Sequence, residues 1–122
     1  MKTPKDPRHL ERIEIMQQLF AWSFNGKKPP DNEKARSIVK KIRQIDKLTE
    51  QAAPTWPIAK INKIDLAILR LAIFELVFEK NVPPKVAVDE AVELAKSYGS
   101  DSSPGFINGA LGKLISDLKI EA

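Results

Sequence analysis

The stretch from Ile64 to Phe78 is the feature that most restricts the fold, because it is apolar on nearly every side. Only Asp65, Arg70 and Glu75 interrupt it. With these charges it is too polar, and also too short, for a membrane span, which needs roughly 20 apolar residues. A helix that is apolar all round belongs in the middle of a helical fold. The sequence therefore predicts a buried central helix from Ile64 to about Lys80.

Glycine and proline residues divide the rest of the chain, and between them apolar residues recur at helical spacing. Asp6-Pro7 is a helix start signal and Asn25-Gly26 a stop signal. Sustained two-residue alternation does not occur, so we expect no sheet. The sequence predicts an all-α fold, a compact helical bundle in which short connections join the helices. The five main helices are expected at about residues 7–25, 31–53, 64–80, 84–98 and 103–118, with a short turn at 56–60.

The start of the central helix carries a capping signal. Asn62-Lys63-Ile64-Asp65 has the spacing of a capping box, with aspartate in place of the usual glutamate. Asp65 could equally contact a protein partner, and the residues alone leave both roles open.

The inventory of catalytic and metal-binding groups is poor. The chain has no cysteine, which excludes disulfides and thiolate sites and suits a reducing cytoplasm. His9 is the only histidine and has no serine or cysteine near it in the sequence. Asp89, Glu90 and Glu93 share one helical turn, where a solvated acidic face is favoured over a cation site. We expect no enzymatic activity, no metal site and no cofactor.

The net charge of +4 is unevenly distributed. Residues 1–60 contain 13 Lys/Arg and 7 Asp/Glu, whereas residues 61–122 contain 7 and 9. A basic half and a mildly acidic half indicate one surface that faces a polyanion and a second, different surface. A solvated lysine-rich exterior is the alternative explanation.

Three blocks of the second half occur in an order and spacing that resemble those of the NusB family. A weaker similarity lies at the N-terminus, where Arg8, His9 and Arg12 precede Leu19-Phe20. The three blocks are IDLAILRLAIFEL at 64–76, VPPKVAVDEAVELAK at 82–96, and Ser103-Pro104 followed by Phe106-Ile107-Asn108-Gly109 and Leu111.

The resemblance implies an all-α protein of two small helical subdomains. Family members bind boxA-type RNA, usually with the ribosomal protein NusE, in RNA polymerase complexes that pass terminators and support ribosomal RNA synthesis. We therefore expect a single cytoplasmic domain over 1–122, divided into 1–55 and 56–122, with no membrane association. The resemblance also admits a homodimer that covers the RNA-binding face.

The sequence departs from the family pattern in three places. The region between Phe24 and Trp56 is short, which predicts an N-terminal half trimmed by one helix relative to longer members. Gly105 stands before Phe106 where lysine is usual, and aspartate is often found at the positions of Ser102 and Gly112. These changes are expected to alter affinity for RNA and for the protein partner.

Basic residues near the start of the chain and an aromatic in the last helix are the predicted RNA contacts. Arg8 and Arg12 are four residues apart, share a helix face and could neutralise phosphates, unless they are ordinary surface arginines. Phe106 could stack on an unpaired base; spacing alone favours a core role, and the resemblance favours RNA. The predicted RNA-binding set is Lys5, Arg8, His9, Arg12, Lys85, Phe106, Asn108 and Lys113.

Phe20, Asp65, Arg70 and Glu75 form the predicted protein-partner surface. The three charges are spaced by five residues and spiral around the central helix, so interior ion pairs or caps are the alternative. The resemblance places Asp65 where relatives touch NusE, and Phe20 near the same edge. The two tryptophans, Trp22 and Trp56, are expected to be core or seam anchors.

Two other functions compete with RNA-binding antitermination. One is a NusB-like protein-interaction module without specific RNA binding, which Gly105 and the trimmed N-terminal half favour. The other is a fragment of those ribosomal RNA cytosine methyltransferases that carry a NusB-like helical domain. The absence of a methyltransferase domain and of a glycine-rich cofactor loop argues against the second.

Overall fold

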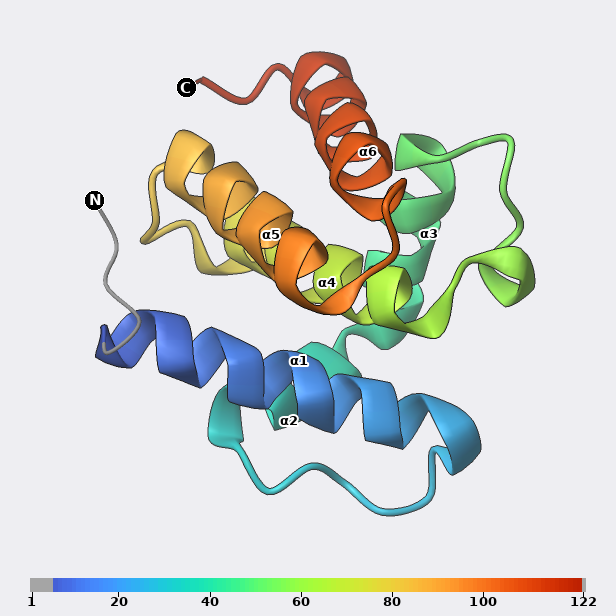
Figure 1. The fold of residues 1–122 in the computed structure, drawn as a ribbon, viewed down its shortest axis with the longest axis vertical. Helices are drawn as coiled ribbons and strands as arrows, with labels where there is room; N and C mark the ends of the chain where they lie inside the picture. Colours follow the sequence, from blue (N-terminus) through green and yellow to red (C-terminus); the bar gives the residue numbers. More distant parts are fainter. Residues whose placement is uncertain (1–5, 122) are drawn as a thin grey trace.

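Every regular element of the computed structural model, which describes residues 6–121, is helical (Figure 1). No strand occurs within these residues, and the all-α prediction is confirmed. The elements are α1 (Pro7–Asn25), α2 (Glu33–Lys40), α3 (Ile42–Ala52), the short 3₁₀ turn η1 (Ile58–Lys60), α4 (Lys63–Ile73), the π-helical turn η2 (Phe74–Glu79), α5 (Pro84–Tyr98) and α6 (Ser103–Leu118).

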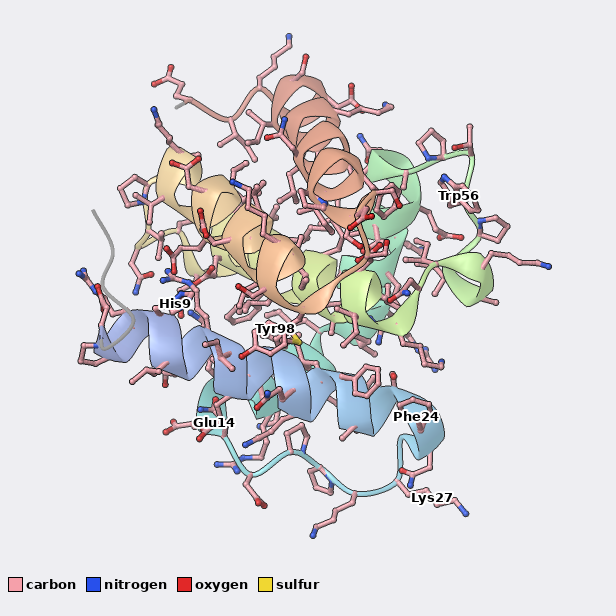
Figure 2. All side chains as sticks on the ribbon, viewed as in Figure 1. His9, Glu14, Phe24, Lys27, Trp56 and Tyr98 are labelled. Carbon is pink, nitrogen blue, oxygen red and sulfur yellow. The ribbon has the colours of Figure 1, made fainter. Side chains whose placement is uncertain are left out.

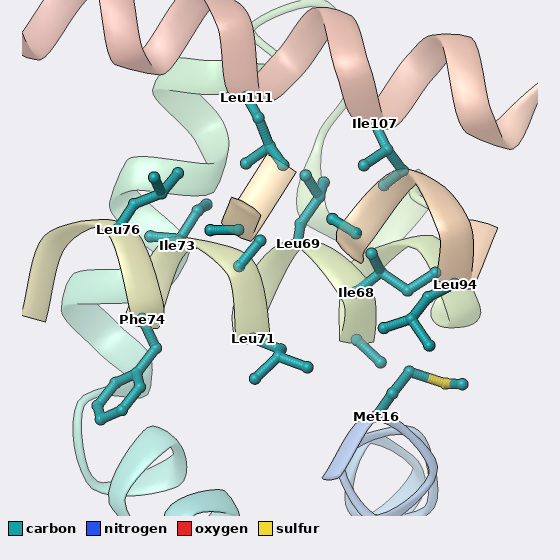
Figure 3. Packing of buried hydrophobic residues seen from close by; sticks show 14 of the residues in the cluster. Met16, Ile68, Leu69, Leu71, Ile73, Phe74, Leu76, Leu94, Ile107 and Leu111 are labelled. Carbon is teal, nitrogen blue, oxygen red and sulfur yellow. The ribbon is translucent and has the colours of Figure 1, made fainter. Parts of the chain in front are cut away.

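Helix α4 is the centre of the fold, as its apolar sequence predicted. Residues 65–73 are all buried, and α1, α3, α5 and α6 pack around the helix. In Figure 3, Leu69 of α4 faces Leu111 of α6, while Met16 of α1 approaches Leu94 of α5. Each fully buried leucine or isoleucine contributes about 1.5–3 kcal/mol, so this cluster provides most of the driving force for folding.

The ends of α1 follow from local chemistry that the sequence displays. The Asp6 carboxylate accepts a hydrogen bond from the Arg8 N–H at 2.9 Å, and Pro7 occupies the first turn. At the other end Gly26 has a φ of 65°, and its N–H donates to the Trp22 carbonyl at 2.8 Å. Glycine adopts this left-handed conformation without steric cost, so the helix stops there.

The single helix expected over residues 31–53 is wrong, because the chain breaks at Lys41 into α2 and α3. Lys41 has a φ of −106° and a ψ of 18°, and no glycine or proline marks the position. The break serves packing: α2 contacts α1, whereas α3 contacts α4 and α6. Ile38 and Ile45 are both fully buried. Because they are seven residues apart, a straight helix would place them on the same face, towards the same neighbouring helix.

The helix that begins with α4 ends in a wide turn. In η2 the N–H of Lys80 donates to the carbonyl of Glu75, five residues back, at 3.1 Å. Lys80 then takes a φ of 59°, which ends the helix where the sequence predicted. Such π turns are rare and often occur at functional sites.

The division into subdomains at residue 55 stays a prediction, because α1 and α3 both pack on α4 and the buried apolar residues form one cluster. Within residues 6–121, every helix falls short of the length and apolarity that crossing a membrane requires.

Candidate functional site

A network of buried charges joins α1, α2, η2 and α5. The Arg12 Nε lies 3.1 and 3.2 Å from the two carboxylate oxygens of Glu75, and its Nη1 lies 3.2 Å from Oε1 of Glu90. The Lys34 Nζ lies 2.8 Å from Glu75 Oε2 and 2.8 Å from Glu79 Oε1. Glu75 is 1% exposed and serves both cations, so it is the centre of the network.

The network keeps its two cations charged. Burial alone would lower the pKa of Arg12, but hydrogen bonding and charge from Glu75 outweigh burial and raise the pKa above its ordinary value. Burial likewise opposes the charge of Lys34, and Glu75 with Glu79 raises the pKa of Lys34 despite it. Loss of one partner would leave a buried charge uncompensated, which typically costs about 3–5 kcal/mol.

An open cleft of about 690 Å³ lies over this network, between the start of α1 and the turn that leads into α5. His9 lies at the N-terminal end of α1 (Figure 2), with its Nδ1 3.4 Å from Glu90 Oε1. Carboxylates and cations both line the cleft, so its charge is mixed rather than uniformly basic. His9 lines the cleft together with the charged side chains of Asp6, Arg8, Glu11, Arg12, Lys34, Glu75, Glu79 and Glu90.

The predicted RNA contacts near the N-terminus have different surroundings. The Arg8 side chain is 84% exposed, and its guanidinium lies 3.5 Å from the Asp6 carboxylate, so a phosphate can reach it but competes with Asp6. Arg12 is only 8% exposed and is held by two carboxylates, which corrects the expectation of a surface phosphate contact. His9 is half-buried beside Glu90. Lys5 lies outside the described residues.

The remaining predicted RNA contacts lie on α5 and α6. Phe106 is half-buried in the first turns of α6 and packs against the apolar cluster, while Asn108 is exposed. Lys113 is exposed and pairs with Asp117 at 2.6 Å. Lys85 is exposed in the first turn of α5. The fold brings Arg8, His9 and Arg12 together at the cleft and presents the others from these two helices.

Phe20, from the predicted partner surface, lies beside an unusually exposed aromatic residue. Its ring meets that of Phe24 edge to face, with centroids 5.0 Å apart. Phe24 is 62% exposed, and the Lys63 Nζ lies 5.3 Å from its ring centroid. The end of α1 and the start of α4 thus share a small aromatic and cationic surface.

Asp65, two residues after Lys63, is buried. Only half of the expected capping box forms around it. The Asn62 side chain accepts hydrogen bonds from the N–H groups of Ile64 and Asp65, at 2.8 and 3.3 Å. The Asp65 carboxylate does not complete the box, and its Oδ1 has no hydrogen-bond partner within residues 6–121. A buried carboxylate oxygen without a donor is costly, so Asp65 opposes stability at this position.

Arg70 and Glu75 are interior, which corrects their assignment to a partner surface. Arg70 is 6% exposed, donates to both carboxylate oxygens of Asp46 at 2.9 Å and lies over the ring of Trp22. The interior ion pairs named as the alternative are the arrangement found. Trp56 is 52% exposed, so it is not a core anchor, and a role at the subdomain seam stays a prediction.

The sequence analysis missed Lys34, Glu79 and the burial of Glu90. Glu90 was assigned to a solvated acidic face, but it is 5% exposed and paired with Arg12. One signal was present: Glu90 lies on the same helix stripe as Ala87, Ala91 and Leu94, which are all buried. In the described part of the chain, no group of three or more His, Asp or Glu side chains is arranged to hold a metal ion.

The fold defines the class of the protein: it is a small all-α protein in which five helices surround a single buried helix, α4. Within that class the family is shown by comparison, since residues 32–116 match the model of the NusB family. The chain belongs to the NusB family.

Individual relatives agree. A protein from Agathobacter rectalis named transcription antitermination protein NusB is 37% identical over 103 residues, covering 84% of this chain and 79% of the relative. Alignments with two further relatives, from Clostridium novyi and Lachnoclostridium phytofermentans, span 63% and 64% of their lengths. The expected trimming of the N-terminal half relative to longer members stays a prediction.

Two solved structures share the fold. The structure of T. maritima NusB is 31% identical, has a TM-score of 0.80, and is matched over 96% of this chain and 94% of its own. The structure described as antitermination factors NusB and NusE in complex with dsRNA has a TM-score of 0.74 at 22% identity, over 92% of this chain and 99% of its own.

Proposed function

We propose that this chain is a non-enzymatic antitermination factor that binds boxA-type RNA together with the ribosomal protein NusE. In this role it joins RNA polymerase complexes that support ribosomal RNA transcription. The observation that carries the proposal is the family match over residues 32–116, which takes in α2 to α5 and most of α6. A relative named for transcription antitermination, and the fold shared with a NusB–NusE–dsRNA complex, support the same role.

The RNA contacts that the geometry supports are the exposed members of the predicted set. Arg8 offers an exposed guanidinium for a phosphate, and Phe106 has a partly exposed ring that can stack on an unpaired base. Lys85, Asn108 and Lys113 are exposed and complete the proposed surface. Arg12 acts indirectly, because its ion pairs hold α1 against α5 and so position Arg8.

The proposed NusE contact lies at the end of α1 and the start of α4. Phe20 is half-buried beside the exposed Phe24, which is suited to apolar contact with a protein. Asp65, at the start of α4, is the other residue of the predicted NusE contact; it is only 7% exposed, so Phe20 and Phe24 offer most of the accessible surface.

The decisive experiment is binding of a short labelled boxA-like RNA and a scrambled control, with and without NusE, at two salt concentrations. We expect a preference for boxA that NusE strengthens. Absence of preference in every condition would instead support a protein-interaction module, for which Gly105 in place of lysine is the specific observation. A homodimer that covers the RNA surface would appear as RNA affinity that falls as protein concentration rises.

A single substitution tests the aromatic contact. Phe106→Ala is expected to lower RNA affinity by roughly tenfold, because stacking contributes about 1–3 kcal/mol per base. Leu118→Ala, in the same helix and 38% exposed, is the matched control and should leave RNA affinity unchanged. A large loss of thermal stability in Phe106→Ala, with unchanged RNA affinity, would assign the ring to the core.

A further inference from the structure

Four exposed cations lie within eight consecutive residues, 40–47, where α2 meets α3. They are Lys40, Lys41, Arg43 and Lys47, which we call the α2–α3 basic face. None of them has a carboxylate partner within residues 6–121, although the Lys41 Nζ lies 5.2 Å from the ring centroid of Phe78. The break at Lys41 joins the end of one helix to the start of the next and so gathers these charges.

The carboxylates near this face do not compensate it. Asp46 lies within the same stretch, but both of its oxygens accept hydrogen bonds from the buried Arg70 at 2.9 Å. Glu50, one turn beyond Lys47, forms no ion pair with it. Lys34 and Lys113, by contrast, each have a carboxylate partner. Since like charges repel, the face destabilises the free protein slightly and favours binding of a polyanion.

The composition of the face indicates the kind of partner. Protein interfaces are usually built on apolar and aromatic anchors. The exposed large hydrophobic side chains of the described chain all lie elsewhere, on α1, α5, α6 and the loop after α3. Lysine and arginine without apolar anchors are typical of contacts to a phosphate backbone, which carry affinity but no sequence information.

We propose that the α2–α3 basic face binds the phosphate backbone of the RNA strand where it continues beyond the boxA segment. This inference rests on the proposed function. Helices α3 and α5 pack on α4 from different sides (Figure 1), so the face is separate from the surface assigned to Lys85. A short RNA occupies only the surface of Arg8 and Phe106, and a longer strand reaches both.

The test compares a short boxA-like RNA with the same RNA extended by unpaired flanking nucleotides. Arg43→Gln combined with Lys47→Gln is expected to lower affinity for the extended RNA about tenfold at ~0.15 M salt and the salt slope by about 1.4, since each single-strand phosphate contact contributes about 0.7. Binding of the short RNA should stay the same. Lys60→Gln with Lys96→Gln removes the same charge from exposed positions elsewhere and should leave both affinities unchanged.

The outcomes separate this inference from the proposed function. Unchanged binding of extended RNA in the Arg43→Gln, Lys47→Gln variant would overturn the inference, even if the boxA preference holds. An equal loss in the control variant would also overturn it, because the effect would then be net charge. A loss confined to the Arg43/Lys47 variant supports the face, and it does so even if wild-type protein shows no boxA preference. All four positions are exposed, and unchanged thermal melting verifies that the variants are folded.

Discussion

The two sides of the central helix are both packed with apolar residues, but only one of them also carries ion pairs. Towards α6, Leu69 and Ile73 meet Leu111 in purely apolar packing. Towards α1 and α2, apolar packing through Leu19 and Ile38 is joined by ion pairs, because Glu75 just beyond α4 contacts the buried Arg12 and the half-buried Lys34. Apolar packing stabilises in proportion to the area buried, with little demand on partner identity. Buried ion pairs add little net stability but strongly penalise any arrangement that leaves one partner alone, so they fix position.

Glu75→Ala tests the ionic side and has the largest expected effect. It leaves Arg12 and Lys34 without their shared carboxylate, and we expect a loss of about 4 kcal/mol in the free energy of unfolding. Urea denaturation measures it. Glu93→Ala, an exposed position, is the control and should change stability by less than about 0.5 kcal/mol. A similar small change for Glu75→Ala would show that the network does not hold α1 in place.

Leu111→Ala tests the apolar side, with an expected loss of about 3 kcal/mol because Leu111 is fully buried. Measuring both variants at several salt concentrations separates the two sides, because the stability loss in Leu111→Ala should not depend on ionic strength. Leu118→Ala in the same helix should have a much smaller effect. If the Leu111→Ala loss varied with salt as much as that of Glu75→Ala, the two sides of the helix would not differ as described.

Asn62→Ala tests the N-terminal cap of α4, which belongs to neither the ion pairs nor the contact with α6. Its side chain accepts hydrogen bonds from two backbone N–H groups, and loss of such a cap costs about 1 kcal/mol. Thermal melting monitored by circular dichroism measures the change. Asn108→Ala, an exposed asparagine inside α6, is the matched control, and an equal effect there would rule out capping as the cause.

Alkaline pH gives the smallest expected effect, and comparison with a Lys34 variant isolates its action on the ion pairs. Because the pKa of Lys34 in the folded protein is raised above its ordinary value of 10.5, its contribution to stability is complete below that pH. The contribution is lost as the pH rises through the higher folded-state pKa. Melting temperature measured above pH 10 should therefore fall less steeply in Lys34→Met than in the wild type. Parallel curves would show that Lys34 does not couple to folding.

The sequence predicted the apolar side better than the ionic side, for a physical reason. Periodicity reports which positions are buried, and it placed α4 at the centre and bounded α1 by Asp6 and Gly26. It does not report which charges pair across the fold, because Lys34 and Glu75 are far apart in the chain. The break at Lys41 was also hidden, since tertiary packing rather than glycine or proline causes it.

The candidate site was predicted unevenly for the same reason. The family resemblance predicted Arg8 and Phe106 as RNA contacts. Arg8 is exposed and Phe106 is half-buried, so both can be reached by RNA. The resemblance also supplied Arg12, whose burial depends on two distant carboxylates that no local pattern displays. The burial of Glu90 could have been predicted from its helix stripe, whereas the exposure of Trp56 could not, because loop geometry decides it.

The wide turn η2 contains a residue that a regular α-helix spanning the same length would not need. The side chains before and after η2 therefore do not follow one continuous α-helical repeat, because the repeat is shifted by that one residue. Anyone who transplants this helix into a designed bundle, or aligns it with a relative whose helix is regular, must introduce a one-residue gap within 74–79. Without that gap Leu69 keeps its place in the core, but Glu79 rotates away from Lys34.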